Sequence, residues 1–292
     1  MKFSLLLGFS LIFQQLSLSN NETDISKSHA HININQKDLF LYSPNIPIIA
    51  SKELNHLMDE INKQVKKEPK NAFIDSNGNI QPEKTGFQLD RQKFIENVYW
   101  SYFENKPLSS EITLEPIYPK VDSELLDVIR TKKIGRYVTQ FNQNKVERSN
   151  NILLAAEAIN NTVIFPNETF SFNKVVGRRT LEKGYLTAPV IIDGEYSKDI
   201  GGGICQVSST LFNAVDNAGL EIVERYSHSR EINYVPPKRD ATVSWNGPDF
   251  VFQNNYNQPI LIQAKKRYSH LIIEIYSSDS ISNIPRKVPY LP

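Results

Sequence analysis

The chain has 292 residues, which is enough for one large domain or for two domains of ordinary size. Its formal net charge is +1 and 22% of its residues are charged, without a long basic block, so the composition does not indicate a nucleic-acid-binding protein. One cysteine excludes a disulfide bond within this chain, and one cysteine with scattered histidines offers too few ligands for a zinc site. No Lys-Ser/Thr pair follows the glycines at 201–203, so a P-loop is absent as well. We therefore expect neither a metal nor an organic cofactor.

The N-terminus has the pattern of a targeting segment. Lys2 precedes an apolar run over residues 3–13, and small residues follow in cleavage-like positions. The run is too short to span a bilayer comfortably, and no cysteine follows it to carry a lipid anchor. We expect residues 1–19 to be a signal peptide, or else an uncleaved anchor that tethers the protein to the membrane. Residues 20–36 are polar and rich in Asn and Ser, which is typical of a linker.

Residues 37–119 are expected to form a small α+β domain. Apolar residues recur at helical spacing between 54 and 65, and Asp90 is a suitable N-cap for a second helix. Asn77-Gly78 lies between two short apolar runs, which is typical of a β-hairpin turn. A short strand at 112–117 closes the domain.

Residues 120–280 are expected to form a larger α+β domain, followed by a tail at 281–292. A helix that follows three glycines and carries Cys205 should pack against an antiparallel sheet, and Gly219 should end this helix. The other expected elements are, in chain order, a short helix at 125–129, a strand at 135–141, a helix from 151 capped by Ser149 or Asn150, a strand fragment at 170–172, a hairpin with its tip at Asp193-Gly194, strands at 220–226 and 241–245, and a hairpin formed by 259–264 and 271–276.

Cys205 is the first candidate for chemistry. An unpaired thiol in an exported protein is a liability unless it is used. The preceding glycines allow close approach of a ligand, and a helix N-terminus favours the thiolate. These features indicate a nucleophile, with a buried structural thiol as the alternative.

A thiol nucleophile needs a base, and the base needs a group that fixes its tautomer. His228 ends the strand expected after the cysteine helix, and Asp240 begins the next expected strand. The three residues would form a Cys–His–Asp triad, with the backbone N–H groups of Cys205 and Gln206 as an oxyanion hole. The alternatives are a histidine that bonds only locally and an aspartate that serves a turn.

Substrate-binding candidates surround Cys205 in the sequence. Gly202 and Gly203 would let a ligand approach the backbone, while Gln206 or Ser208 could contribute a side-chain donor. Arg230 could hold a substrate carboxylate or could be solvated, and the same choice applies to Arg178 and Arg179.

Several ordered motifs resemble the VanW domain of bacterial cell-envelope proteins. They span roughly residues 130–275 and include Lys183-Gly-Tyr-Leu-Thr-Ala-Pro-Val, Gly201-Gly-Gly-Ile-Cys-Gln-Val-Ser-Ser-Thr, His228-Ser and Asp240-Ala-Thr-Val. Residues 37–119, with Thr85-Gly-Phe-Gln-Leu-Asp, more loosely resemble the small domain often found ahead of VanW and described as peptidoglycan-binding. Two loops depart from the family pattern, at Pro166-Asn167 and at 236–240.

The resemblance implies an activity. Some VanW-domain proteins are understood to be L,D-transpeptidases that join peptidoglycan stem peptides through 3-3 cross-links with a cysteine nucleophile. Carried over, Cys205 is the nucleophile, His228 the base and Asp240 the residue that orients it, and the partners are stem peptides outside the cytoplasm. Two alternatives stay open: a cysteine hydrolase acting on the same stems, and a non-catalytic module that binds the cell wall.

Overall fold

The protein forms two compact units in a computed structural model that describes residues 29–31, 40–41, 48–49, 51–106, 108, 111–192 and 195–291. The first unit contains the described residues up to Ala72 together with Pro82–Asp122, and the second contains Phe73–Gln81 and the residues from Ser123 onward. The expected signal segment at 1–19 and the expected hairpin tip at Asp193-Gly194 lie outside the described residues.

The first unit packs two helices with a small antiparallel sheet. Asp90 caps α2 as predicted, because its Oδ1 accepts a hydrogen bond from the Lys93 amide at 3.0 Å. The core consists of Leu54, Met58, Ile61, Leu89, Phe94, Val98 and Ile112. The elements are β1 (His29–His31), β2 (Phe40–Leu41), β3 (Ile48–Ile49), α1 (Ser51–Val65), β6 (Gly86–Leu89), α2 (Arg91–Phe103) and β7 (Glu111–Ile117), with sheet order β1-β7-β6.

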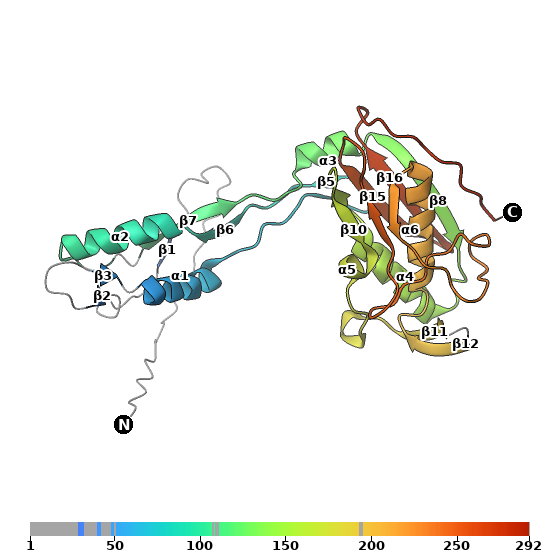
Figure 1. Ribbon diagram of the computed structural model, residues 1–292, viewed down its shortest axis with the longest axis horizontal. Helices are drawn as coiled ribbons and strands as arrows, with labels where there is room; N and C mark the ends of the chain where they lie inside the picture. Colours follow the sequence, from blue (N-terminus) through green and yellow to red (C-terminus); the bar gives the residue numbers. More distant parts are fainter. Residues whose placement is uncertain are drawn as a thin grey trace, which may run out of the picture. The chain divides into compact units, whose positions relative to one another are not determined.

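The second unit is built on a four-stranded antiparallel sheet of order β8-β16-β15-β9. Figure 1 shows α4 and α6 lying along this sheet, and α6 contacts β8 and β16 while α4 contacts β15 and α6. Buried side chains of both helices and the sheet share one apolar core. The elements are β8 (Lys132–Gln140), α4 (Val146–Ile159), β9 (Val163–Ile164), α6 (Ile204–Ala218), β15 (Ile260–Arg267) and β16 (His270–Ser277).

Smaller elements surround this frame. The hairpin of β4 (Phe73–Ile74) and β5 (Ile80–Gln81), predicted from Asn77-Gly78, packs with α3 (Ser123–Ile129) in the second unit. The remaining elements are β10 (Thr169–Ser171), α5 (Phe172–Val176), the 3-10 helix η2 (Leu181–Lys183), β11 (Thr187–Ile192), β12 (Glu195–Ile200), β13 (Glu221–Glu224) and β14 (Val251–Gln253), of which β10, β14 and β13 form a second sheet and β11 pairs with β12.

The mixed α+β architecture agrees with the sequence, and α6 is the predicted helix that carries Cys205. Two local predictions were wrong. The fourth helix begins at Val146 with Lys145 as its N-cap, so Ser149 and Asn150 lie inside it. Residues 241–245 join no ladder, and β14 pairs with β13 instead.

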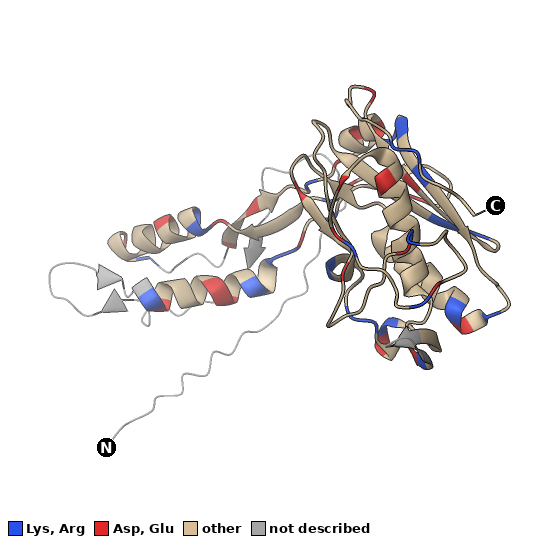
Figure 2. Ribbon diagram, turned by 45° about the vertical axis from the view of Figure 1, so that its right-hand side comes forward, with Lys and Arg blue, Asp and Glu red and all other residues tan. Residues whose placement is uncertain are grey.

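Charge is nearly absent from the central helix. Figure 2 shows α6 almost free of charged residues, and Asp216 is the one acidic or basic residue in its 15. Both faces of α6 are buried, so its polar residues must find partners inside the protein. Among the described residues, no helix combines the length and the apolar character that a membrane crossing requires.

Candidate functional site

Cys205 lies in the first turn of α6, just after a run of three glycines, two of which have the positive φ that glycine adopts most readily. Gly203 is the N-cap with a φ of 109°, and Gly201 has a φ of 91°. The positive end of the helix dipole at this turn favours a thiolate. The side chain is half-buried, and Sγ lies 3.7 Å from Thr242 Oγ1 and 3.5 Å from the Val243 carbonyl oxygen.

His228 is fixed by Asp240. The ring Nδ1 lies 2.6 Å from Asp240 Oδ2, and the backbone N–H of His228 donates to the same oxygen at 2.6 Å. Both side chains are 7% exposed, so water competes little for this pair. Because Nδ1 is engaged, Nε2 is the ring nitrogen left to interact with the Cys205 thiol, and the two groups shift each other's pKa.

Loops, and not the ends of regular strands, carry this pair. Strand β13 stops at Glu224, so His228 follows in irregular backbone, and Asp240 precedes a segment without a ladder. Hydrogen bonds to each other and to neighbouring elements fix both loops. Thr242 donates its backbone N–H to the Tyr226 carbonyl at 2.8 Å, which joins the two loops directly.

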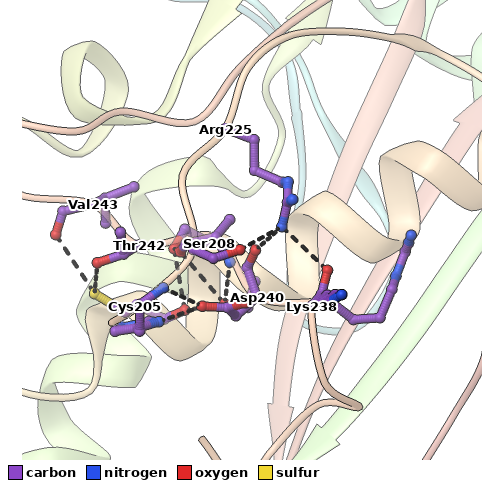
Figure 3. A network of polar contacts seen from close by, with 12 residues as sticks. Cys205, Ser208, Arg225, Lys238, Asp240, Thr242 and Val243 are labelled. Atoms are coloured by element: carbon purple, nitrogen blue, oxygen red, sulfur yellow. Dashed lines mark hydrogen bonds and ion pairs between the residues drawn. The ribbon is translucent and has the colours of Figure 1, made fainter. Parts of the chain in front are cut away.

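Polar side chains on α6 anchor the Asp240 loop, as Figure 3 shows for Ser208. Ser208 Oγ donates to the Ala241 carbonyl at 2.5 Å, and Ser209 Oγ accepts from the Ala241 amide at 2.9 Å. On the other side, Arg225 Nη1 donates to the Asp240 carbonyl at 2.5 Å and to the Lys238 carbonyl at 3.3 Å. The helix that presents the thiol therefore also positions the carboxylate behind the imidazole.

The electrostatics of the three groups favour an ion pair. Burial raises the pKa of the Cys205 thiol, but the hydrogen bond and charge of His228 outweigh it, with help from Val243 and Thr242, so the pKa falls below its usual value. Burial lowers the pKa of His228, yet its hydrogen bonds to Asp240 and Cys205 raise it to about 9. Burial opposes a low pKa at Asp240, but the hydrogen bonds with His228 hold it below its usual value. The shifts of Cys205 and His228 thus both favour a thiolate beside an imidazolium over the neutral pair.

The thiol and imidazole open into a large cavity of about 1790 Å³ in the second unit. Cys205 and His228 both line it, and Arg148, Arg179 and Trp245 line other parts of its wall. This volume exceeds what a small metabolite needs, roughly 300–1,000 Å³, so the cavity has room for a peptide.

The two predicted glycines play different parts. Gly203 lines the cavity, whereas Gly202 is buried beneath it. A Cβ on Gly202 would lie 2.6 Å from the carbonyl oxygens of Ala188 and Pro189 in β11. Gly202 therefore permits close packing of the β11–β12 hairpin, and a ligand does not face it directly.

The other three predicted substrate contacts differ in where they lie. Gln206 lines the cavity but is largely buried, with Nε2 donating to Thr139 Oγ1 at 2.9 Å and Oε1 accepting from Arg148 at 2.7 Å. Ser208 is buried as well, and its hydroxyl bonds to backbone within the protein. Arg230 is exposed and is not among the residues that line the cavity. We propose that Gln206 and Ser208 position the site from within.

One of the two backbone amides predicted to form the oxyanion hole already donates a hydrogen bond within the protein. The Gln206 amide donates to the Gly203 carbonyl at 3.0 Å, and the Ile204 amide donates to the Gly201 carbonyl at 3.2 Å. The Cys205 amide between them stays our proposed donor to an oxyanion, and the Thr242 hydroxyl near Sγ is a second donor that the sequence did not single out.

Comparisons with known proteins place the chain in a family. The profile described as "VanW like protein" matches residues 147–276, and the profile described as "Putative peptidoglycan binding domain" matches residues 47–108. A Bacillus subtilis protein named "Uncharacterized protein YoaR" is 49% identical over 288 residues, which are 99% of this chain and 95% of the relative. "Vancomycin B-type resistance protein VanW" of Enterococcus faecalis is 32% identical over 124 residues, 39% of this chain and 42% of the relative. No solved structure matches the chain.

Proposed function

The chain belongs to the VanW-like family and carries a peptidoglycan-binding domain, and from this premise we propose that it is an extracytoplasmic L,D-transpeptidase of the cell wall. The observation that supports the proposal best is the half-buried Cys205 thiol, paired with a His228–Asp240 couple and open to a cavity large enough for a peptide. Family membership alone supports only a cell-wall role, so the chemistry depends on this geometry.

In the first step, the Cys205 thiolate attacks the carbonyl carbon between the third residue of a donor stem and its terminal D-Ala. A carbon–sulfur bond forms, the carbon–nitrogen bond breaks, and the departing amine of D-Ala takes a proton from the His228 imidazolium. Asp240 keeps the ring oriented and stabilises its positive charge until the proton leaves. The product is a thioester, which retains the energy needed to make a new amide.

In the second step, the side-chain amine of an acceptor stem attacks the thioester carbonyl. His228, now neutral, accepts a proton from this amine, and the thiolate departs as the 3-3 amide bond forms. The cycle thus returns the site to thiolate and imidazolium without any external oxidant or cofactor. If water attacked the thioester in place of the amine, the same residues would make the protein a hydrolase. The product analysis below therefore distinguishes the two reactions.

The proposal predicts a covalent intermediate on one atom. Wild-type protein incubated with a donor tetrapeptide should gain the mass of the acyl tripeptide in intact-protein mass spectrometry, and Cys205→Ala should gain nothing. Cys205→Ser tests the sulfur itself, since a hydroxyl of similar size beside His228 should acylate far more slowly.

Product analysis then separates the candidate reactions. Muropeptide dimers with 3-3 links indicate a transferase, and shortened stems without dimers indicate a hydrolase. A wild-type protein that forms no adduct, together with a Cys205→Ala strain that keeps its 3-3 links, would leave only the wall-binding module.

A further inference from the structure

Two arginines from separate elements approach the thiol from either side of the glycine run. Arg148 lies in the first turn of α4, and Arg179 lies between α5 and η2, yet both line the cavity that holds Cys205. Both also interact electrostatically with Cys205. Arg179 was a candidate from the sequence, but nothing there indicated that Arg148 lies near the same thiol.

The glycines explain how the arginines come so close. A Cβ on Gly201 would lie 3.3 Å from Arg179 Cβ, and a Cβ on Gly203 would lie 2.9 Å from Arg148 Cγ. Each arginine stem therefore packs on a glycine backbone within a few residues of Cys205. A larger residue at either glycine would displace an arginine as well as strain the left-handed backbone.

Amide side chains hold both guanidinium groups in place. Arg148 Nη2 donates to Gln206 Oε1 at 2.7 Å, and Arg179 Nη2 donates to Asn173 Oδ1 at 2.8 Å. Asn173 is itself fixed, because its Nδ2 donates to the carbonyls of Ser244 and Pro248 at 2.8 and 3.1 Å. Neutral amides orient the two cations without neutralising them, so the positive charge stays available to a ligand.

Arg179 has a donor left over. Among the side-chain nitrogen and oxygen atoms of the described residues, Arg179 Nη1 is the one that is buried without a hydrogen-bond partner. The nearby carboxylate of Asp249 is occupied, since it accepts from Ser171 Oγ and from the Asn173 amide. A buried, unpartnered guanidinium nitrogen is costly unless an anion binds there during function.

From this arrangement we propose that Arg179, supported by Arg148, binds the C-terminal carboxylate of the donor peptide. The inference rests on the proposed function, in which the residue that leaves is the last residue of the stem. In such a residue the carboxylate carbon lies only about 3–4 Å from the carbonyl carbon under attack, given standard backbone bond lengths. A carboxylate site must then lie close to the nucleophile, as these two arginines do. Arg230, which the sequence also offered for this role, does not line the cavity.

The ligand can test the proposal without altering the protein. Two donor tetrapeptides, identical except that one ends in a free carboxylate and the other in a primary amide, are compared for the rate of acyl-enzyme formation by intact-protein mass spectrometry. The amide keeps the scissile bond but cannot accept a charge-assisted bidentate pair. We expect wild type to be acylated about 10- to 100-fold faster by the carboxylate donor.

The variants then assign the preference to a residue. Arg179→Gln should lose most of the preference by slowing the carboxylate donor, while its rate with the amide donor stays within a few-fold of wild type. Arg179→Lys keeps a charge but loses the planar fork, so it should recover only part of the preference. Arg230→Gln removes the same charge outside the cavity and should keep the wild-type ratio.

The outcomes distinguish the two proposals. Equal acylation of wild type by both donors overturns the carboxylate site but leaves the transpeptidase intact, since an adduct still forms. A preference that survives in Arg179→Gln also overturns the assignment. Absence of any adduct on Cys205 with either donor overturns the proposed function, and the carboxylate site with it.

Discussion

At the scale of single residues, the charge of the Cys205 sulfur depends on its neighbour. Burial alone would favour the neutral thiol, and His228 reverses that preference through a hydrogen bond and a positive charge. Asp240 in turn makes the positive imidazole stable, which is why the pKa of His228 rises to about 9. The reactivity of the Cys205 sulfur thus depends on His228 directly and on Asp240 through His228.

This dependence predicts a pH profile for alkylation. The thiolate is the reactive form, so the rate of reaction with iodoacetamide should rise with pH and reach its plateau below the pH at which an ordinary cysteine does, because the thiol pKa is lowered. In His228→Gln that pKa rises, and once it lies above 7 each further unit lowers the thiolate fraction at pH 7 about tenfold. His56→Gln, at an exposed histidine of the first unit, should leave the profile unchanged.

Acylation by a peptide should respond differently at high pH. Amide cleavage needs the proton on His228, so its rate should fall as pH passes about 9, whereas alkylation needs no proton donor and should stay level. A wild-type alkylation profile identical to that of His228→Gln would contradict the ion pair.

The sequence predicted Cys205, His228 and Asp240 because chemistry restricts which residue types can act together and the motifs preserve their order. It offered Arg179 only as one of three arginines that could bind a carboxylate or be solvated, and it gave no signal for Arg148, since neither arginine lies near Cys205 in the chain. Their convergence depends on the packing of α4 and of the loop after α5 against the glycine run. Gln206 and Ser208 were expected to face a ligand because of their proximity to the cysteine. Ser208 is buried away from the cavity, and Gln206 lines it with an amide that already bonds to Thr139 and Arg148.

At the scale of elements, α6 both carries Cys205 and holds the loop that carries Asp240. Its apolar residues pack on the sheet, while buried Ser209 and Asn213 receive the loop that carries Asp240. A strand was predicted at 241–245, after Asp240. The structure has no strand there, because the backbone of Ala241 bonds to side chains of α6 and not to a neighbouring strand. Periodicity reports which side chains are buried but not what satisfies the backbone.

Gly202 should determine how closely the β11–β12 hairpin packs against the start of α6. In Gly202→Ala, the new Cβ would collide with two carbonyl oxygens of β11, and relief requires the hairpin or the start of α6 to move. We expect a loss of about 1–3 kcal/mol in the free energy of unfolding. We also expect slower alkylation of Cys205, measured beside thermal unfolding on the same samples.

Gly78→Ala is the matched control for this change. Gly78 has a φ of 87°, so alanine strains its backbone, but its Cβ would meet nothing within 4 Å and the turn lies away from α6. This variant should lose stability by about 1–2 kcal/mol and keep wild-type thiol reactivity. Unchanged reactivity in both variants would show that the hairpin does not position the thiol.

At the scale of the whole molecule, the chain passes between its two units at 72–73, 81–82 and 122–123. The β4–β5 hairpin lies within the sequence of the first unit but packs in the second. Its attachment is a side-chain clip: Asn161 Oδ1 accepts from the Ile74 amide and Asn161 Nδ2 donates to the Ile74 carbonyl, both at 3.0 Å. The sequence indicated the hairpin from its turn but offered no signal for this partner, because an amide that mimics a neighbouring strand has no periodic signature.

Loss of the clip should free the hairpin without unfolding the rest of the second unit. In Asn161→Ala, both backbone groups of Ile74 lose their partners, which should cost about 1–3 kcal/mol and speed hydrogen exchange at the Ile74 amide. Asn161 has a φ of 61°, so alanine also strains the backbone there. Asn167→Ala corrects for that strain, since Asn167 has a φ of 65° and is exposed. Fast exchange at Ile74 in Asn161→Ala alone is expected, and equal protection in the two variants would mean that packing on α3, and not the clip, holds the hairpin to the second unit.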